Sequence, residues 1–119
     1  DFSAKSGYEA LENLVSIDEG AKYLGEIALV PFDSPISNLG ILFYNTLFDE
    51  NASCHLAIGQ AYSSCIQNGD KLSSEEMEKV GMNDSLTHVD FMFGTSDLSI
   101  VGYEENGNCE NIFINGNWA

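Results

Sequence analysis

The stretch Leu47–Tyr62, LFDENASCHLAIGQAY, determines our prediction of both the fold and the candidate site of this 119-residue chain. It places Asp49 and Glu50 five or six residues before His55, one of only two histidines in the sequence. Larger apolar side chains alternate with smaller ones over residues 54–58. This alternation predicts a β-strand that carries His55 on its less bulky, more open face.

The second histidine lies in a similar pattern. His88 and Asp90 occupy alternate positions of a strand-like run, residues 87–93, and residues i and i+2 of a strand share a face about 6.6 Å apart. Both side chains can therefore converge on one metal ion, or on two ions about 3.5–4 Å apart. Imidazole and carboxylate together suit zinc, cobalt or manganese. Spacing alone leaves a surface histidine beside an aspartate as the alternative.

The same two interpretations stay open for the first histidine. His55 suits either a metal site or a hydrogen bond in the core, and Asp49 and Glu50 suit either a site or a solvated turn. Glu26 opens an apolar run, so its carboxylate lies either near the sheet or exposed at the start of the strand. Tyr62 follows His55 by seven residues, an odd offset that would place it on the opposite face of a straight strand. Tyr62 can therefore share a site with His55 only if Gly59 bends the chain.

The charge balance excludes two classes of partner. The chain has 4 basic and 19 acidic residues and a net charge of −15, so it has too few Lys and Arg to bind nucleic acid or an anionic membrane. The acidic excess suits metal ions and amine-bearing substrates, although simple solubility explains it equally well. With 44% hydrophobic residues, the chain is expected to form one globular domain.

Cysteine usage predicts a cytoplasmic protein. The three cysteines, Cys54, Cys65 and Cys109, are odd in number and form no Cys-x-x-Cys pair. This pattern argues against a disulfide scaffold and favours small buried hydrophobes in a reducing compartment. No run of about 18 apolar residues is present, so no membrane span is expected, and no secretory signal is recognised. The chain opens on Asp1 rather than methionine, which suggests a piece of a longer protein.

The elements expected along the chain predict an α+β fold. It is expected to have a mixed or mostly antiparallel sheet, a few short helices and one domain. Turn chemistry is expected at residues 33–40, a site-bearing loop at 45–51 and a polar loop at 67–72. Helices are expected within residues 6–24 and 73–81, and strands at 26–31, 41–44, 54–58, 87–93, 98–103 and 111–114.

Three ordered motifs resemble a known family. The runs GEIALVP (25–31), LFDENASCHLAIGQAY (47–62) and HVDFMFG (88–94) look like the thermophilic metalloaminopeptidases of the aminopeptidase T and aminopeptidase S family. The tail NGNWA (115–119) also resembles the carboxyl end of that family. Because members of the family are longer, the resemblance implies that residues 1–119 form the C-terminal catalytic, metal-binding domain of a longer aminopeptidase.

The resemblance also implies a reaction and a set of site residues. The family removes N-terminal residues from peptides with two divalent ions, such as zinc, cobalt or manganese, and is dimeric as a rule. A peptide with a free N-terminus is the implied substrate. The catalytic residues implied are Glu50, as ligand or general base, and Tyr62. The implied metal ligands are Glu26, Glu50, His55, His88 and Asp90. Glu26 is the implied bridge between the two ions.

An alternative is a domain without catalysis. The resemblance implies a further glutamate ligand upstream, and no residue before Glu26 matches its motif. The chain would then be an isolated fragment or oligomerisation domain that lacks one metal ligand and is inactive alone. Zinc titration separates this alternative from a complete metal site.

Overall fold

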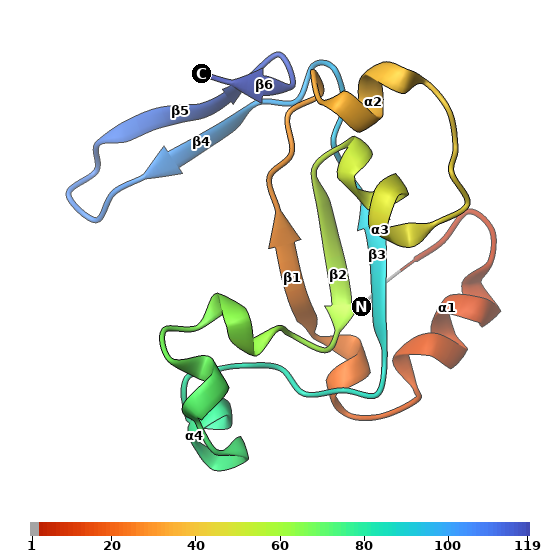
Figure 1. The fold of residues 1–119 in the computed structure, drawn as a ribbon, viewed down its shortest axis with the longest axis vertical. Helices are drawn as coiled ribbons and strands as arrows, with labels where there is room; N and C mark the ends of the chain where they lie inside the picture. Colours follow the sequence, from red (N-terminus) through yellow and green to blue (C-terminus); the bar gives the residue numbers. More distant parts are fainter. Residues whose placement is uncertain (1–2) are drawn as a thin grey trace. The chain divides into compact units, whose positions relative to one another are not determined.

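A computed structural model describes residues 3–119 as two small β-sheets with short helices around them (Figure 1). The first sheet has the order β1-β2-β3 and contains Leu24–Ala28, His55–Gly59 and His88–Met92. Its neighbouring strands point in opposite directions (Figure 1). The prediction of an α+β fold with mostly antiparallel strands is therefore confirmed.

The second sheet is an antiparallel hairpin with one added strand. β4 (Ile100–Tyr103) pairs with β5 (Cys109–Ile114), and β5 pairs with β6 (Asn117–Trp118). Phe113 of β5 is fully buried, and its ring lies 4.5 Å from that of Trp118 between centroids. The β4 and β5 strands are confirmed as elements, whereas the two-residue β6 was missed.

The chain divides into two compact units, each made of two stretches. Residues 1–26 and 57–89 form the first unit, and residues 27–56 and 90–119 form the second. The first unit contains α1 (Tyr8–Val15) and α4 (Ser74–Lys79), and the second contains α2 (Pro35–Leu39), α3 (Thr46–Asp49) and the second sheet. The division passes through β1, β2 and β3, so each of these strands contributes residues to both units.

The predicted helices are confirmed in part. α1 has the helical spacing of Leu11, Leu14 and Val15, but the rest of the helical region expected within residues 6–24 contains only a 3₁₀ turn at Gly20–Lys22. α4 begins with a capping box in which the Ser73 side chain accepts from the Glu76 amide and the Glu76 side chain accepts from the Ser73 amide.

Three predictions between residues 33 and 51 are wrong. The expected turn contains α2, because Ser34 caps its start and Pro35 occupies its first position. The expected loop at 45–51 contains α3, which Asn45 caps, followed by a 3₁₀ turn at Glu50–Ala52. Residues 41–44 form no strand, because the Asp49 carboxylate accepts from the Phe43 and Asn45 amides at 2.8 and 2.9 Å.

The burial of the cysteines differs from the expectation. Cys54 is buried at 1% exposure, whereas Cys65 and Cys109 are exposed, and all three are free thiols. Only the first therefore behaves as a core residue. Across residues 3–119, no helix is both long and apolar enough to cross a bilayer.

Candidate metal centre

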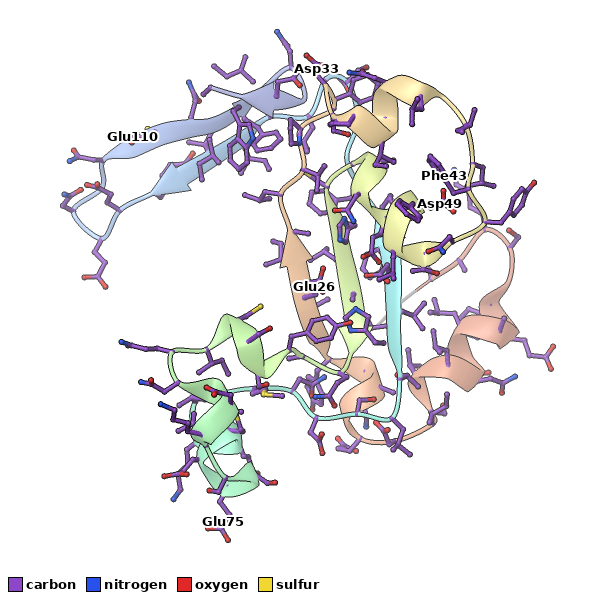
Figure 2. The ribbon with its side chains drawn as sticks, viewed as in Figure 1. Glu26, Asp33, Phe43, Asp49, Glu75 and Glu110 are labelled. Carbon is purple, nitrogen blue, oxygen red and sulfur yellow. The ribbon has the colours of Figure 1, made fainter. Side chains whose placement is uncertain are left out.

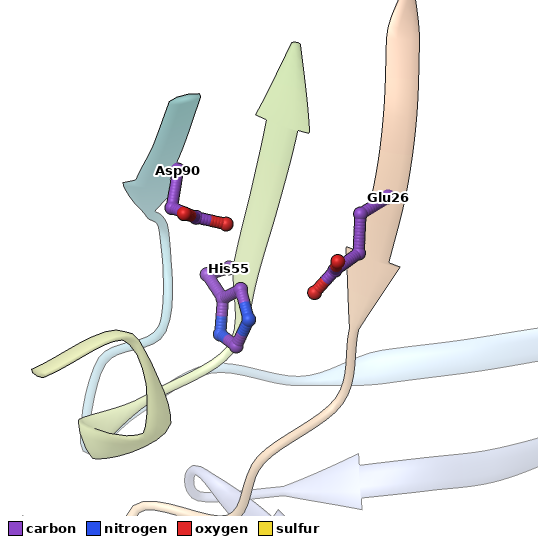
Figure 3. Close-up of side chains that lie close together, drawn as sticks. All are labelled: Glu26, His55 and Asp90. Carbon is purple, nitrogen blue, oxygen red and sulfur yellow. The ribbon is translucent and has the colours of Figure 1, made fainter. Parts of the chain in front are cut away.

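Three side chains from neighbouring strands of the first sheet lie together: Glu26 on β1, His55 on β2 and Asp90 on β3 (Figure 3). Each offers one ligand atom, and these atoms lie within 4.8 Å of one another. His55 is only 2% exposed, and the other two are partly buried. Imidazole nitrogen and carboxylate oxygen are the donors that zinc and similar ions take in proteins, so the group is chemically suited to a divalent ion.

His55 begins β2 and lies on the buried face of the strand, whereas the prediction placed it on the open face. The predicted alternation is confirmed, but His55, Ala57 and Gly59 form the buried face and not the open one. The ring Nδ1 lies 3.0 Å from the Ser53 carbonyl oxygen. A carbonyl can only accept, so Nδ1 carries the proton, and in the neutral ring the lone pair is on Nε2. This is the tautomer that a metal-binding histidine requires.

His88 has the same orientation in the first unit. Its Nδ1 lies 2.7 Å from the Gln60 carbonyl oxygen, which places the lone pair of the neutral ring on Nε2. That Nε2 lies 3.6 Å from Glu26 Oε2. Two ligands of a tetrahedral ion, each about 2.1 Å from it, lie about 3.4 Å apart. The spacing between His88 and Glu26 is therefore close to that of two ligands of one ion.

Tyr62 comes beside His88 because the chain bends after β2. Gly59 ends the strand at a φ of 100°, in the left-handed region that favours glycine. A Cβ at this position would overlap the Thr87 carbonyl, which also requires glycine. Beyond the bend, the Tyr62 ring lies 4.9 Å from the His88 ring between centroids, at 51°. The bend that the sequence required for Tyr62 to share the site is therefore present.

The two acids before His55 differ in their surroundings. Glu50 lines a cavity of about 280 Å³ together with Asp90, so it lies beside the donor group. Asp49 also lines this cavity, but its two carboxylate oxygens accept from the Phe43 and Asn45 amides. Figure 2 shows Asp49 next to Phe43. Asp49 therefore holds the preceding loop and is outside the group of possible metal donors found among the described residues.

Sequence reasoning missed the groups that orient the two rings. The Ser53 and Gln60 carbonyls fix the tautomers of His55 and His88. Asn83 holds the segment that contains Gln60, because its side chain donates to the Gly59 carbonyl and its own carbonyl accepts from the Ala61 amide. No sequence signal marks a backbone carbonyl, since every residue has one.

The comparisons with known proteins define the class. The model of the thermophilic metalloprotease family (M29) matches residues 1–118, and the chain belongs to this family. This finding confirms the resemblance on which the ligand assignment is based.

Individual relatives are named as aminopeptidases. The chain is 58% identical to "Aminopeptidase 2" of Geobacillus stearothermophilus and 42% identical to "Aminopeptidase T" of Thermus aquaticus, each over all 119 residues. It spans 29% of the length of these curated relatives. The solved structure of wild-type AmpT from Thermus thermophilus matches 99% of this chain and 28% of its own, with a TM-score of 0.86 and 43% identity.

Proposed function

We propose that this chain is the C-terminal metal-binding domain of a longer aminopeptidase, which hydrolyses the first peptide bond of substrates with a free N-terminus. The observation that carries the proposal is the proximity of Glu26, His55 and Asp90 to one another, within 4.8 Å. Membership in a metalloprotease family and relatives named as aminopeptidases support the same function. The chain spans only part of those relatives, so the activity is proposed for the full-length polypeptide.

The Glu26 carboxylate is central to the proposed set of metal ligands. Glu26 lies near both histidines: it belongs to the donor group with His55 and lies 3.6 Å from His88 Nε2. Glu26 would therefore help to hold divalent ions together with both histidines, and we take these to be two ions of zinc, cobalt or manganese. Asp90 belongs to the proposed ligand set, and Glu50, which lines a cavity with Asp90, is proposed as the general base.

Two divalent ions, when bound, supply hydroxide at neutral pH by lowering the pKa of water toward 7. The residues of the chain have separate tasks. Glu50 accepts the proton of the water and passes it to the leaving amine. The Tyr62 hydroxyl donates to the oxygen of the attacked carbonyl, where negative charge develops. The net charge of −15 favours the α-ammonium group of the substrate.

Location and assembly belong to the same proposal. Three free cysteines fit a reducing compartment, so a cytoplasmic location is proposed. A homodimer is proposed for the full-length protein, following the resemblance. The alternative is a non-catalytic fragment that folds and associates with other chains, and it is supported by the 29% share of the relatives that this chain spans.

Calorimetric titration with zinc and cobalt tests the proposal on the full-length polypeptide. His88→Ala and Asp90→Asn should each weaken binding by about 100-fold or more, and Glu110→Gln, an exposed carboxylate on β5, should leave it unchanged. Cobalt-dependent release of the chromophore from leucyl and arginyl chromogenic substrates should fall in the variants that bind the metal more weakly. Full activity of His88→Ala would refute the ligand assignment, and absence of metal binding would favour the non-catalytic fragment.

A further inference from the structure

A cavity of the second unit has one wall in common with the proposed metal centre. Its volume is about 280 Å³, and the carboxylates Glu50 and Asp90 line it. The remaining lining includes three large apolar side chains, those of Leu42, Tyr44 and Met92. All five residues belong to the second unit, 27–56 and 90–119. The cavity is therefore lined both by apolar side chains and by carboxylates of the proposed site.

The backbone at Tyr44 is held in an unusual conformation. Its φ is 56°, in the left-handed region that non-glycine residues rarely adopt. Asp49 stabilises this conformation from α3, because its two oxygens accept from the amides on either side of Tyr44, those of Phe43 and Asn45, at 2.8 and 2.9 Å. The Phe43 ring also stacks on Phe48 at 5.3 Å between centroids, which anchors the same loop.

Packing among residues 3–119 gives no reason for this conformation. Tyr44 is 90% exposed, so the strained backbone presents its ring at the cavity and not in the core. Leu42 and Met92, at 62% and 51%, are also exposed. Strained backbone held by specific hydrogen bonds beside a candidate site indicates a role in binding.

We propose that this cavity binds the apolar side chain of the substrate's N-terminal residue, with Leu42, Tyr44 and Met92 as its walls and Asp49 as a positioning residue for Tyr44. This inference rests on the proposed aminopeptidase function. The side chain of the first residue branches from the carbon next to the attacked carbonyl, so it must enter a space that adjoins the metal donors. Glu50 and Asp90 line such a space.

The size and the apolar walls of the cavity define the preferred residues. A cavity of about 280 Å³ lies just below the range of about 300–1,000 Å³ that is typical of pockets for whole small ligands, so it has room for one large side chain. The apolar walls favour leucine, methionine and phenylalanine over alanine.

The test compares leucyl- and alanyl-p-nitroanilide with the metal-loaded full-length polypeptide. Leu42→Ala should lower the ratio of the leucyl kcat/KM to the alanyl kcat/KM about tenfold, mainly through the leucyl KM. Leu39→Ala is the matched control, because Leu39 is 58% exposed in the same unit and lies outside the cavity lining, and it should keep the wild-type ratio.

Asp49→Ala tests the positioning role. Release of the Tyr44 loop should lower the same ratio by a similar factor, whereas a merely structural defect would lower both kcat/KM values together. An unchanged ratio in Leu42→Ala and Asp49→Ala, with metal-dependent activity retained, would overturn this inference alone. Absence of metal-dependent release from both substrates by the wild type would overturn the proposed function, and this inference with it.

Discussion

Asp18 joins two segments of the first unit through its carboxylate. Its oxygens accept from the amides of Leu86 and Ala21 at 2.7 and 2.8 Å, and from the Ser85 hydroxyl at 2.9 Å. These hydrogen bonds, of which the one from the Leu86 amide has the largest effect, lower the pKa of Asp18 below its usual value of 3.8, because they favour the charged form. The carboxylate therefore stabilises the folded state only while it is ionised.

Asp18→Asn should lower the stability of the chain at neutral pH. Because the folded pKa is lowered, the contribution of Asp18 is fully present above the unfolded value of 3.8 and is lost as the pH falls through the folded pKa. Urea unfolding at pH 7 should show a less stable variant, and the difference from wild type should shrink below about pH 4. Asp70→Asn, at an exposed aspartate of the same unit, is the control. A difference that stays constant down to pH 2.5 would contradict this account.

The two histidines show what single residues could and could not reveal. Their residue type and the neighbouring acids were sufficient to predict metal chemistry. Their orientation was not predictable, because it depends on the carbonyls of Ser53 and Gln60. Gln60 follows His55 by five residues but orients His88, which lies on another strand. Such a contact depends on strand pairing and is not encoded in local spacing.

At the scale of elements, Asn83 connects the ends of two strands to a turn. Its side chain donates to the carbonyls of Gly20 and Gly59 at 2.8 and 2.6 Å, and to that of Tyr23 at 3.4 Å. Gly20 starts the 3₁₀ turn before β1, and Gly59 ends β2. One amide therefore satisfies carbonyls from parts of the first unit that are distant in sequence.

Asn83→Ala should lower the free energy of unfolding by about 2 kcal/mol, because it leaves partly buried carbonyls without their donor. Chemical denaturation monitored by circular dichroism measures the change. Asn13→Ala, on the exposed side of α1, should shift stability by no more than about 0.5 kcal/mol. Equal effects of the two substitutions would show that the Asn83 hydrogen bonds add nothing to stability.

The predicted elements were correct where the signal was local. The alternation over residues 54–58 predicted β2, and the helix expected within residues 73–81 is α4. The prediction failed at residues 41–44, because the Asp49 side chain, six residues beyond Phe43, takes the Phe43 amide that a strand would have used for pairing. Burial of His55 was also missed, since alternation identifies two faces and not which of them is covered.

For the whole molecule, charge is the dominant feature. A net charge of −15 over 119 residues produces self-repulsion in the compact state. Salt screens this repulsion, with a Debye length of about 30 Å at 0.01 M and about 10 Å at 0.1 M. The exposed ion pair between Lys22 and Glu19 offsets little of it.

Sodium chloride should therefore raise the thermal midpoint between about 10 and 200 mM, as screening reduces the repulsion. Differential scanning calorimetry on the metal-free protein measures the change. Tetramethylammonium chloride should give the same rise, which separates screening from specific sodium binding. A midpoint that falls with either salt would show that attractive charge pairs outweigh the net repulsion.

The sequence by itself determined the residue types of the site, the α+β class and those elements that depend on neighbours in the chain. Tertiary structure alone decided which donors converge. Glu26, His55 and Asp90 come together because β1, β2 and β3 are adjacent in one sheet. Strand order and register are long-range properties, fixed by the burial of one face and by hydrogen bonds between distant segments. Local spacing therefore identified candidate ligands but could not place them side by side.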